Sequence, residues 1–288
     1  MEAPDLTKAF ALSKMMPSKV IGPDDRASVN LWPTVSHLLA MGDEEKVIGP
    51  DDRVDPGKVE ARLYPWIRVC RLQMRGPAGE SCIGTGWFAG PKTIVTAGHV
   101  VYDTEWPGWD DVTPAWAAAA DVWVGYREGT ALGHALSTDF RAADAWTRFI
   151  DAGPSEEQRR FQIDLGCIQL GESLWDYPRF FDLDVAPDAA LTGQLATASG
   201  FPVDRDNAQI QYRGSAKIDQ VMPNSFYHEV DTFGGESGAP VWLGGANVVQ
   251  PSIVGIHTGG SDEEKRNWAV RMTDDVAALI RGWVAENP

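Results

Sequence analysis

Cysteine, basic residues and long apolar runs are all scarce in this sequence. Three Cys in 288 residues are too few for a disulfide scaffold, and their spacing is not that of metal ligands. The five His are scattered and form no HExxH motif, which argues against a metalloenzyme. We therefore predict no metal, no cofactor and buried free thiols at Cys70, Cys82 and Cys167, although Cys70 and Cys82 could face each other across a hairpin.

The shortage of basic residues limits the partners of the protein. The sequence has 25 Lys and Arg against 41 Asp and Glu, a net charge of −16. Binding to nucleic acid needs the opposite balance. No stretch approaches the roughly 18 apolar residues that a membrane span requires, so we predict neither a nucleic-acid nor a membrane partner. Acids at Glu2 and Asp5 break the pattern of a secretory signal, which indicates a cytoplasmic protein or a chain whose leader is missing.

Apolar and turn-forming residues are abundant, and their pattern predicts an all-β protein. Hydrophobic residues make up 43% of the chain, with 12 Trp and 10 Phe as core material. Short strands separated by Gly and Pro turns favour a barrel or a sandwich. Helices are expected at 140–150 and 274–286, the second with Thr273 as its N-cap. Strands are expected at 64–74, 84–89, 93–97, 122–126, 165–170, 195–200, 209–218, 240–243 and 253–257.

The octapeptide KVIGPDDR occurs twice, at residues 19–26 and 46–53. A solenoid repeat would recur at least three times, and each copy would contain a whole supersecondary unit. We interpret the pair as a duplicated recognition or processing segment. A duplicated loop without a role is the alternative.

Three local sequences contain the groups of a hydrolytic site, and each lies beside an expected strand. They are TAGH, which ends at His99; IDLGCI, which contains Asp164; and GGESGAPV, which contains Ser237. A Ser hydroxyl is a poor nucleophile without a base, and His has the pKa that suits this base. A buried carboxylate then fixes the tautomer of the imidazole. We therefore predict a catalytic triad of His99, Asp164 and Ser237.

The glycines around Ser237 predict an oxyanion hole. They let the backbone turn so that the N–H groups of Gly235 and Ser237 point at one place, an effect worth about 3–4 kcal/mol per donor. The chain order His, Asp, Ser and the absence of G-x-S-x-G disfavour an esterase or acyltransferase of the α/β-hydrolase type. An inactive protease-like binding module is another alternative, but it would typically lack one member of the triad, and all three are present.

These motifs carry a family resemblance. TAGHVV, DLGCIQL and GGESGAPV resemble the three signatures of trypsin-like (chymotrypsin-fold) serine proteases, and the sequence is most similar to the glutamyl endopeptidase, or V8-like, branch. The resemblance extends from Val47 to the C-terminal helix. It implies two antiparallel six-stranded β-barrels with the catalytic cleft between them and a C-terminal α-helix. It also implies a serine endopeptidase that acts on protein or peptide substrates through an acyl-enzyme, in a mostly secreted family.

The resemblance also implies a processed N-terminus. Mature glutamyl endopeptidases similarly begin with a Val-Ile-x-Pro segment, and Val47 lies at a fitting distance before His99, whereas Val20 lies too far ahead. This implies a pro-segment at 1–46, a protease domain at 47–288, and cleavage between Lys46 and Val47 by the protein itself or by an activating protease. The bond between Lys19 and Val20 could be an earlier cut or a decoy, and the alternative is that no processing occurs.

Two signals compete over the substrate side chain. In the glutamyl branch, a Thr, a His and the N-terminal amine receive the carboxylate of the substrate, and these match Thr232, His257 and Val47. In trypsin-like enzymes an acid six residues before the Ser receives Lys or Arg, and Asp231 stands there. If Asp231 faces the pocket floor, the specificity is basic. If it turns away or pairs with His257, cleavage after Glu remains, which is the reading we favour.

The sequence departs from the family pattern at two places. Glu236 stands directly before Ser237, where the family has a small polar residue. The new amine of Val47 could pair with Glu236, as in chymotrypsin-type zymogens, instead of lining the pocket. The interval between His99 and Asp164 is also long, and the extra residues within 103–160 form either a substrate-shaping flap or an inert insertion, the safer interpretation.

Overall fold

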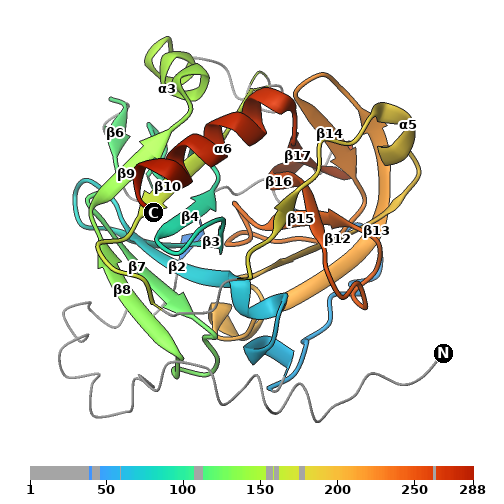
Figure 1. The fold of residues 1–288 in the computed structure, drawn as a ribbon, viewed down its shortest axis with the longest axis horizontal. Helices are drawn as coiled ribbons and strands as arrows, with labels where there is room; N and C mark the ends of the chain where they lie inside the picture. The colour runs from blue at the N-terminus through green and yellow to red at the C-terminus, as the bar shows by residue number, and fades with distance from the viewer. Residues whose placement is uncertain are drawn as a thin grey trace.

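The computed structural model describes residues 39–40, 46–58, 60–106, 113–153, 158, 162–174, 179–261 and 264–288. Nearly all of the expected pro-segment, including the first copy of KVIGPDDR, lies outside these residues. The described residues form two large β-sheets with few helices between and around them (Figure 1). Because the two sheets divide the chain near residue 180, the candidate site residues also fall into two groups.

The first sheet contains the N-terminal half of the described chain. Its strand order is β8-β7-β2-β3-β4-β10-β9, and β1 is added parallel to β3. The two end strands, β8 and β9, are consecutive in the chain with only Thr138 between them, so the sheet curves round until its first and last strands adjoin. Its strands are β1 (Leu39–Ala40), β2 (Val69–Arg75), β3 (Ser81–Phe88), β4 (Thr93–Thr96), β7 (Ala119–Val124), β8 (Gly133–Ser137), β9 (Asp139–Ala142) and β10 (Gly166–Gln169). The short pair β5 (Tyr102–Asp103) and β6 (Ala115–Trp116) lies outside it.

The second sheet is a closed barrel, as the family resemblance implies. The antiparallel order β16-β15-β12-β13-β14-β17 returns to its start through the pairing of β16 with β17, and β11 is added parallel to β16. Its strands are β11 (Asp182–Leu183), β12 (Leu195–Gly200), β13 (Tyr212–Val221), β14 (Ser225–His228), β15 (Pro240–Leu243), β16 (Ser252–Ser261) and β17 (Arg266–Arg271). The fold class, all-β with a C-terminal helix, is therefore confirmed.

The helices agree with the sequence at the C-terminus and differ from it in the middle. The last helix, α6 (Asp274–Glu286), has the expected bounds, and the Thr273 hydroxyl accepts a hydrogen bond from Val276 N at 3.3 Å. The expected helix at 140–150 begins later, as α3 (Asp144–Asp151), because Phe140 pairs with Ile168 in strand β9. Shorter elements are α5 (Asp188–Leu191) and the 3-10 helices η2 (Glu60–Arg62), η3 (Trp66–Arg68) and η4 (Asp206–Ala208).

Three apolar clusters hold the fold together. One lies within the first sheet, one lies within the closed barrel, and the largest joins both sheets to α6 through residues such as Trp87, Trp242 and Trp283. Figure 1 shows α6 in front of β4 and β10, where the Trp283 carbonyl accepts a hydrogen bond from Gln169. The helix therefore packs against the first sheet, although in the chain it follows the last strand of the second barrel.

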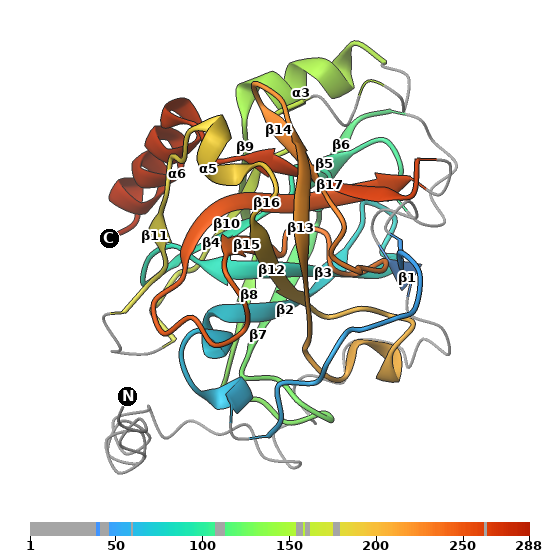
Figure 2. The ribbon, with the colours of Figure 1, turned by 90° about the vertical axis from the view of Figure 1, so that its right-hand side faces the viewer.

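The segment at residues 46–53 belongs in space to the closed barrel. Figure 2 shows the blue N-terminal part of the described chain running beside β13, and Val54 forms a β-bridge with Arg213 of that strand. The chain thus contacts the second barrel between β1 and β2 of the first sheet. This placement brings the second KVIGPDDR copy next to residues that the sequence assigns to the catalytic site.

Candidate active site

His99 and Asp164 meet because two neighbouring strands place them at the same edge of the first sheet. His99 follows β4, Asp164 precedes the antiparallel strand β10, and Thr96 is paired with Gly166. The Asp164 carboxylate accepts two hydrogen bonds from His99, one at 2.7 Å between Oδ2 and the ring Nδ1 and one at 2.9 Å from the backbone N–H to Oδ1. Both residues are buried. One carboxylate therefore fixes the ring and the backbone of the His at once.

The long interval between His99 and Asp164 contributes packing beneath this pair. Trp146 of α3 is fully buried and lies edge-on to the His99 ring, with ring centroids 6.4 Å apart. Its indole N–H donates to the Tyr102 carbonyl at 2.9 Å, which anchors α3 to the chain after His99. The interpretation of the interval as an inert insertion therefore does not extend to Trp146, which supports the His directly.

Ser237 lies at the seam between the two sheets. Its carbonyl accepts a hydrogen bond from Thr85 N of β3 at 2.9 Å, and the next residue, Gly238, donates to the His257 carbonyl of β16 at 2.8 Å. Gly238 has φ +91°, and a Cβ there would lie 2.2 Å from Thr96 Oγ1, so only glycine fits. The segment with Ser237 therefore packs against the end of the strand that leads to His99.

The turn before Ser237 also requires glycine. Gly235 has φ +101°, and a Cβ there would lie 2.6 Å from the Phe201 carbonyl oxygen. The hydroxyl of Thr85 donates to the Gly235 carbonyl at 2.8 Å and accepts from Phe201 N at 3.0 Å. Thr85 of the first sheet thus connects the loops at Phe201 and Gly235 of the second barrel. The turn that the sequence assigns to an oxyanion hole is fixed through the Gly235 carbonyl.

Comparison with known proteins adds the evolutionary relationship. No family model matches the chain. A glutamyl endopeptidase of Bacillus licheniformis is 30% identical over 211 residues, which cover 71% of this chain and 61% of that protein. A solved structure of a Glu endopeptidase in complex with MPD is 25% identical, with a TM-score of 0.66, and the match covers 83% of this chain and 99% of the other. The chain is a homologue of the glutamyl endopeptidases. It shares their chymotrypsin fold.

A second curated protein is also similar to this glutamyl endopeptidase homologue. A protein of Bacillus subtilis named extracellular metalloprotease is 27% identical over 221 residues, which cover 76% of this chain and 64% of that protein. The chain spans about three fifths of the length of these two curated relatives. In the part of the homologue that the structure describes, no three His, Cys, Asp or Glu residues lie close enough together to hold a metal ion, and no helix is long and apolar enough to cross a bilayer.

The two candidate pocket residues of the homologue are buried in the closed barrel. The Thr232 hydroxyl has no hydrogen-bond partner among the described residues, although its side chain is wholly buried. His257 lies in β16, and its Nδ1 is 3.2 Å from Nε2 of the buried His228 in β14. Burial, together with the nearby His99, lowers the pKa of His257 to about 3, so this imidazole is neutral at neutral pH.

Asp231 is turned toward the segment at residues 46–53. Its Oδ1 accepts a hydrogen bond from Ile48 N at 2.6 Å, and its Oδ2 accepts one from Asp52 N at 3.0 Å. The ring of His257 pairs with His228 rather than with Asp231. Both oxygens of the Asp231 carboxylate are therefore bonded to backbone N–H groups of residues 46–53.

Lys46 and Val47 are held beside Thr232. The Lys46 carbonyl accepts hydrogen bonds from Thr232 N at 3.1 Å and from Asn267 Nδ2 at 2.8 Å, and Lys46 N donates to Asn267 Oδ1 at 3.0 Å. The Val47 nitrogen belongs to the same peptide group as this carbonyl. Val47 therefore lies next to Thr232, and Glu236 has a different partner, the buried guanidinium of Arg53 at 3.7 Å.

The sequence does not reveal every residue that builds this region. His228 and Asn267 lie in the strands β14 and β17, which the sequence pattern does not predict, so nothing marks them in advance. Arg53 does have a signal, because it ends the duplicated octapeptide, but the repeated pattern predicts a recognition or processing segment and not a buried ion pair.

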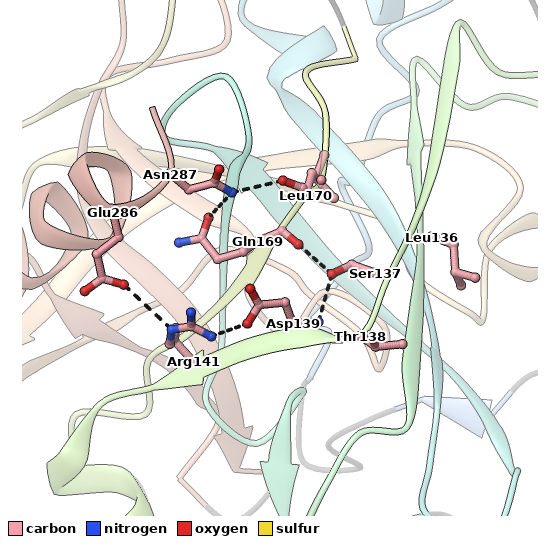
Figure 3. Close-up of a pocket in the computed structure, with 10 residues that line it drawn as sticks. Leu136, Ser137, Thr138, Asp139, Arg141, Gln169, Leu170, Glu286 and Asn287 are labelled. Carbon is pink, nitrogen blue, oxygen red and sulfur yellow. Dashed lines mark hydrogen bonds and ion pairs between the residues drawn. The ribbon is translucent and has the colours of Figure 1, made fainter.

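An open pocket of about 460 Å³ lies away from these residues, where β8, β9 and β10 meet the end of α6 (Figure 3). Its polar groups bond to one another: Arg141 forms ion pairs with Asp139 and Glu286, and Asn287 Nδ2 donates to Gln169 Oε1 at 3.0 Å. None of the residues that line it is a candidate catalytic or specificity residue.

Proposed function

We propose that this protein is a serine endopeptidase whose catalytic residues are His99, Asp164 and Ser237. The observation that carries the proposal is the doubly bonded His99–Asp164 pair, together with the packing of Gly238, beside Ser237, against Thr96 at the end of the strand that leads to His99. His99 takes the proton of the Ser237 hydroxyl as Oγ attacks the peptide carbonyl, and Asp164 stabilises the imidazolium. The N–H groups of Gly235 and Ser237 receive the developing oxyanion.

The reaction then follows acyl transfer in two halves. The new bond joins Ser237 Oγ to the acyl carbon, the C–N bond of the substrate breaks, and His99 gives its proton to the leaving amine. Water attacks the acyl-enzyme with His99 again as base, and the carboxylate product leaves as Ser237 regains its proton. Because the same amide bond joins the residues of proteins and of peptides, the substrates are proteins or peptides.

We further propose cleavage after Glu. A carboxylate entering the pocket needs hydrogen-bond donors, and the buried Thr232 hydroxyl, which has no partner among the described residues, supplies one. His257 is neutral and donates as an uncharged imidazole. Asp231 does not oppose an acidic side chain from the pocket floor, because its two oxygens hold the backbone of residues 48 and 52. This arrangement supports acidic rather than basic specificity.

Cleavage between Lys46 and Val47 would complete this pocket. The new α-amino group of Val47 arises one peptide group away from Thr232, because the Lys46 carbonyl is bonded to Thr232 N. A positive charge there attracts the carboxylate of the substrate. In this proposal residues 1–46 are a pro-segment and residues 47–288 are the protease. Because the bond follows Lys46, a separate activating protease makes the cut, and self-processing belongs to the alternative of basic specificity. The name of the Bacillus subtilis relative, extracellular metalloprotease, supports a secreted protein.

Active-site labelling with a fluorophosphonate probe tests the catalytic part. The wild-type protein should be labelled covalently, because Ser237 Oγ displaces fluoride from phosphorus with His99 as base. Ser237→Ala should abolish both labelling and peptide hydrolysis. A wild-type protein without labelling would instead be a protease-like binding module.

A peptide library tests the specificity and the role of Val47. Protein that begins at Val47 should cut after Glu, and uncut protein should cut the same peptides much more slowly. Cleavage after Lys or Arg would restore the basic alternative through Asp231, and equal hydrolysis by the two forms would remove Val47 from the pocket.

A further inference from the structure

Arg53, the last residue of the second KVIGPDDR copy, has a fully buried side chain at the centre of an acidic cluster. Its guanidinium binds Asp51 through Nε at 3.0 Å and Nη2 at 2.8 Å. It also binds Asp204 through Nη1 at 3.0 Å and Nη2 at 2.5 Å, and Nη1 lies 3.7 Å from the buried carboxylate of Glu236. Two bidentate pairs and a third carboxylate leave this cation one orientation.

The partners of Arg53 belong to three different segments. Asp51 lies in the 46–53 segment, Asp204 in the loop after β12, and Glu236 immediately before Ser237. The loop at residues 233–236, which we call the oxyanion loop, is bonded further to the same cluster. Phe233 N donates to Glu236 Oε2 at 3.0 Å, and Val203 N donates to the Gly234 carbonyl at 2.9 Å.

The balance of charges around Arg53 indicates that its guanidinium compensates the buried carboxylate of the oxyanion loop. The three carboxylates of Asp51, Asp204 and Glu236 face two cations, Arg53 and the more exposed Arg205, which binds Asp51. Glu236 is 1% exposed, and burial of a charge is unfavourable unless an opposite charge accompanies it. The pairing with Asp51 and Asp204 raises the pKa of Arg53 above its usual range, so the cation is permanent.

We propose that Arg53 is the counter-ion of Glu236 and positions the oxyanion loop in the uncut chain. This inference rests on the proposed function, and it divides the activation of the enzyme into two parts. The oxyanion loop is ordered by a side chain within the chain, so it needs no new amino terminus. Cleavage before Val47 then acts on the specificity pocket alone.

The test compares Arg53→Met with Arg26→Met, because residues 19–26 repeat the same octapeptide and so provide a matched control. Arg53→Met should lower kcat for a Glu peptide by about 10²–10³, the loss seen when an oxyanion donor is removed, and should change KM little. Arg26→Met should leave both constants unchanged.

A second pair of measurements separates loop positioning from simple loss of structure. A peptide aldehyde, whose tetrahedral adduct places an oxygen in the oxyanion hole, should bind Arg53→Met more weakly by the same factor as kcat. A product peptide that ends in Glu, which fills only the pocket, should bind both proteins equally. Equal losses for both ligands, or an unchanged kcat at temperatures where the variant is folded, would overturn the proposal.

Glu236→Gln tests the same ion pair from the other side, and it can be measured even if Arg53→Met does not fold. It preserves an acceptor for Phe233 N but removes the charge, so kcat should fall while KM stays, and the Arg53→Met/Glu236→Gln double variant should lose no more than the worse single variant. Additive losses would show that the two residues act separately and would overturn the proposal.

Fluorophosphonate labelling distinguishes this inference from the proposed function. The probe requires the triad and the oxyanion hole but has no side chain for the pocket. Uncut wild-type protein should therefore react at a rate similar to that of protein beginning at Val47, and Arg53→Met should react slowly in both forms. If wild-type protein does not react, the proposed triad fails; if wild type and Arg53→Met react equally, only the role of Arg53 fails.

Discussion

The first sheet and the closed barrel hold their parts of the candidate site in different ways. In the first sheet, His99 and Asp164 bind each other, and the register of β4 and β10 is enough to bring them together. In the barrel, Thr232 and Glu236 are tied to residues 46–53, which come from the beginning of the described chain. The His99–Asp164 pair thus depends on one sheet alone, whereas the part of the candidate site around Ser237 also depends on the docking of residues 46–53.

Breaking the His99–Asp164 pair should have the largest effect on turnover. Asp164→Asn should lower kcat about 10⁴-fold, because the amide stabilises the wrong tautomer of the imidazole. The measurement is steady-state hydrolysis of a Glu peptide. Asp121→Asn is a matched control in the same sheet, because Asp121 forms a similar pair with His134. The distance from Asp121 Oδ1 to His134 Nε2 is 2.5 Å, and neither residue belongs to the candidate site. A comparable fall in both variants would mean that the sheet, and not the triad, is affected.

On the side of the second barrel, removal of the Thr232 hydroxyl should have a smaller effect, and one that is confined to specificity. Thr232→Val keeps the shape of the side chain and removes a donor to the substrate carboxylate, an interaction worth about 1.5–3 kcal/mol. We therefore expect kcat/KM for a Glu peptide to fall about 10- to 100-fold. Labelling by the fluorophosphonate and hydrolysis of the matching Gln peptide should change little. A uniform loss on both peptides would remove Thr232 from specificity.

The buried His228–His257 pair should make the barrel sensitive to acid. Burial holds the pKa of both side chains below their usual value, to about 3 for His257. Between about pH 6.5 and 3 the unfolded chain therefore binds more protons, so stability is full above pH 6.5 and falls as the pH falls, by up to about 1.4 kcal/mol per pH unit for each His. In urea denaturation, His228→Asn should lose less stability between pH 7 and pH 5 than wild type, and equal losses would contradict this origin.

Local patterns predict much of this molecule, and long-range contacts account for what they miss. The strands with clear apolar runs and the helix after Thr273 are found where the sequence places them, because their turns and caps are local signals. The strand Asp139–Ala142 is mistaken for helix, since its pairing with β10 outweighs the helical preference of the nearby Ala and Phe residues.

In the candidate site, too, local motifs predict some residues, and long-range contacts determine the others. The resemblance identifies His99, Asp164 and Ser237 from short motifs, and the structure brings the first two into direct contact. It cannot identify Arg53 as the partner of Glu236, because nothing in a one-dimensional pattern joins residues so far apart. The orientation of Asp231 is undecided for the same reason, since it depends on backbone N–H groups of the 46–53 segment.

The three thiols are chemical reporters for the first sheet alone. Cys70, Cys82 and Cys167 are free and buried, and all lie in β2, β3 and β10 of the first sheet, where the register pairs Cys70 with Gly86 and Cys82 with Met74 rather than with each other. Burial raises the pKa of each thiol, so none is a thiolate in the native protein. An alkylating reagent would therefore modify this protein only while the first sheet is transiently unfolded, and it would not detect an unfolding event confined to the second barrel.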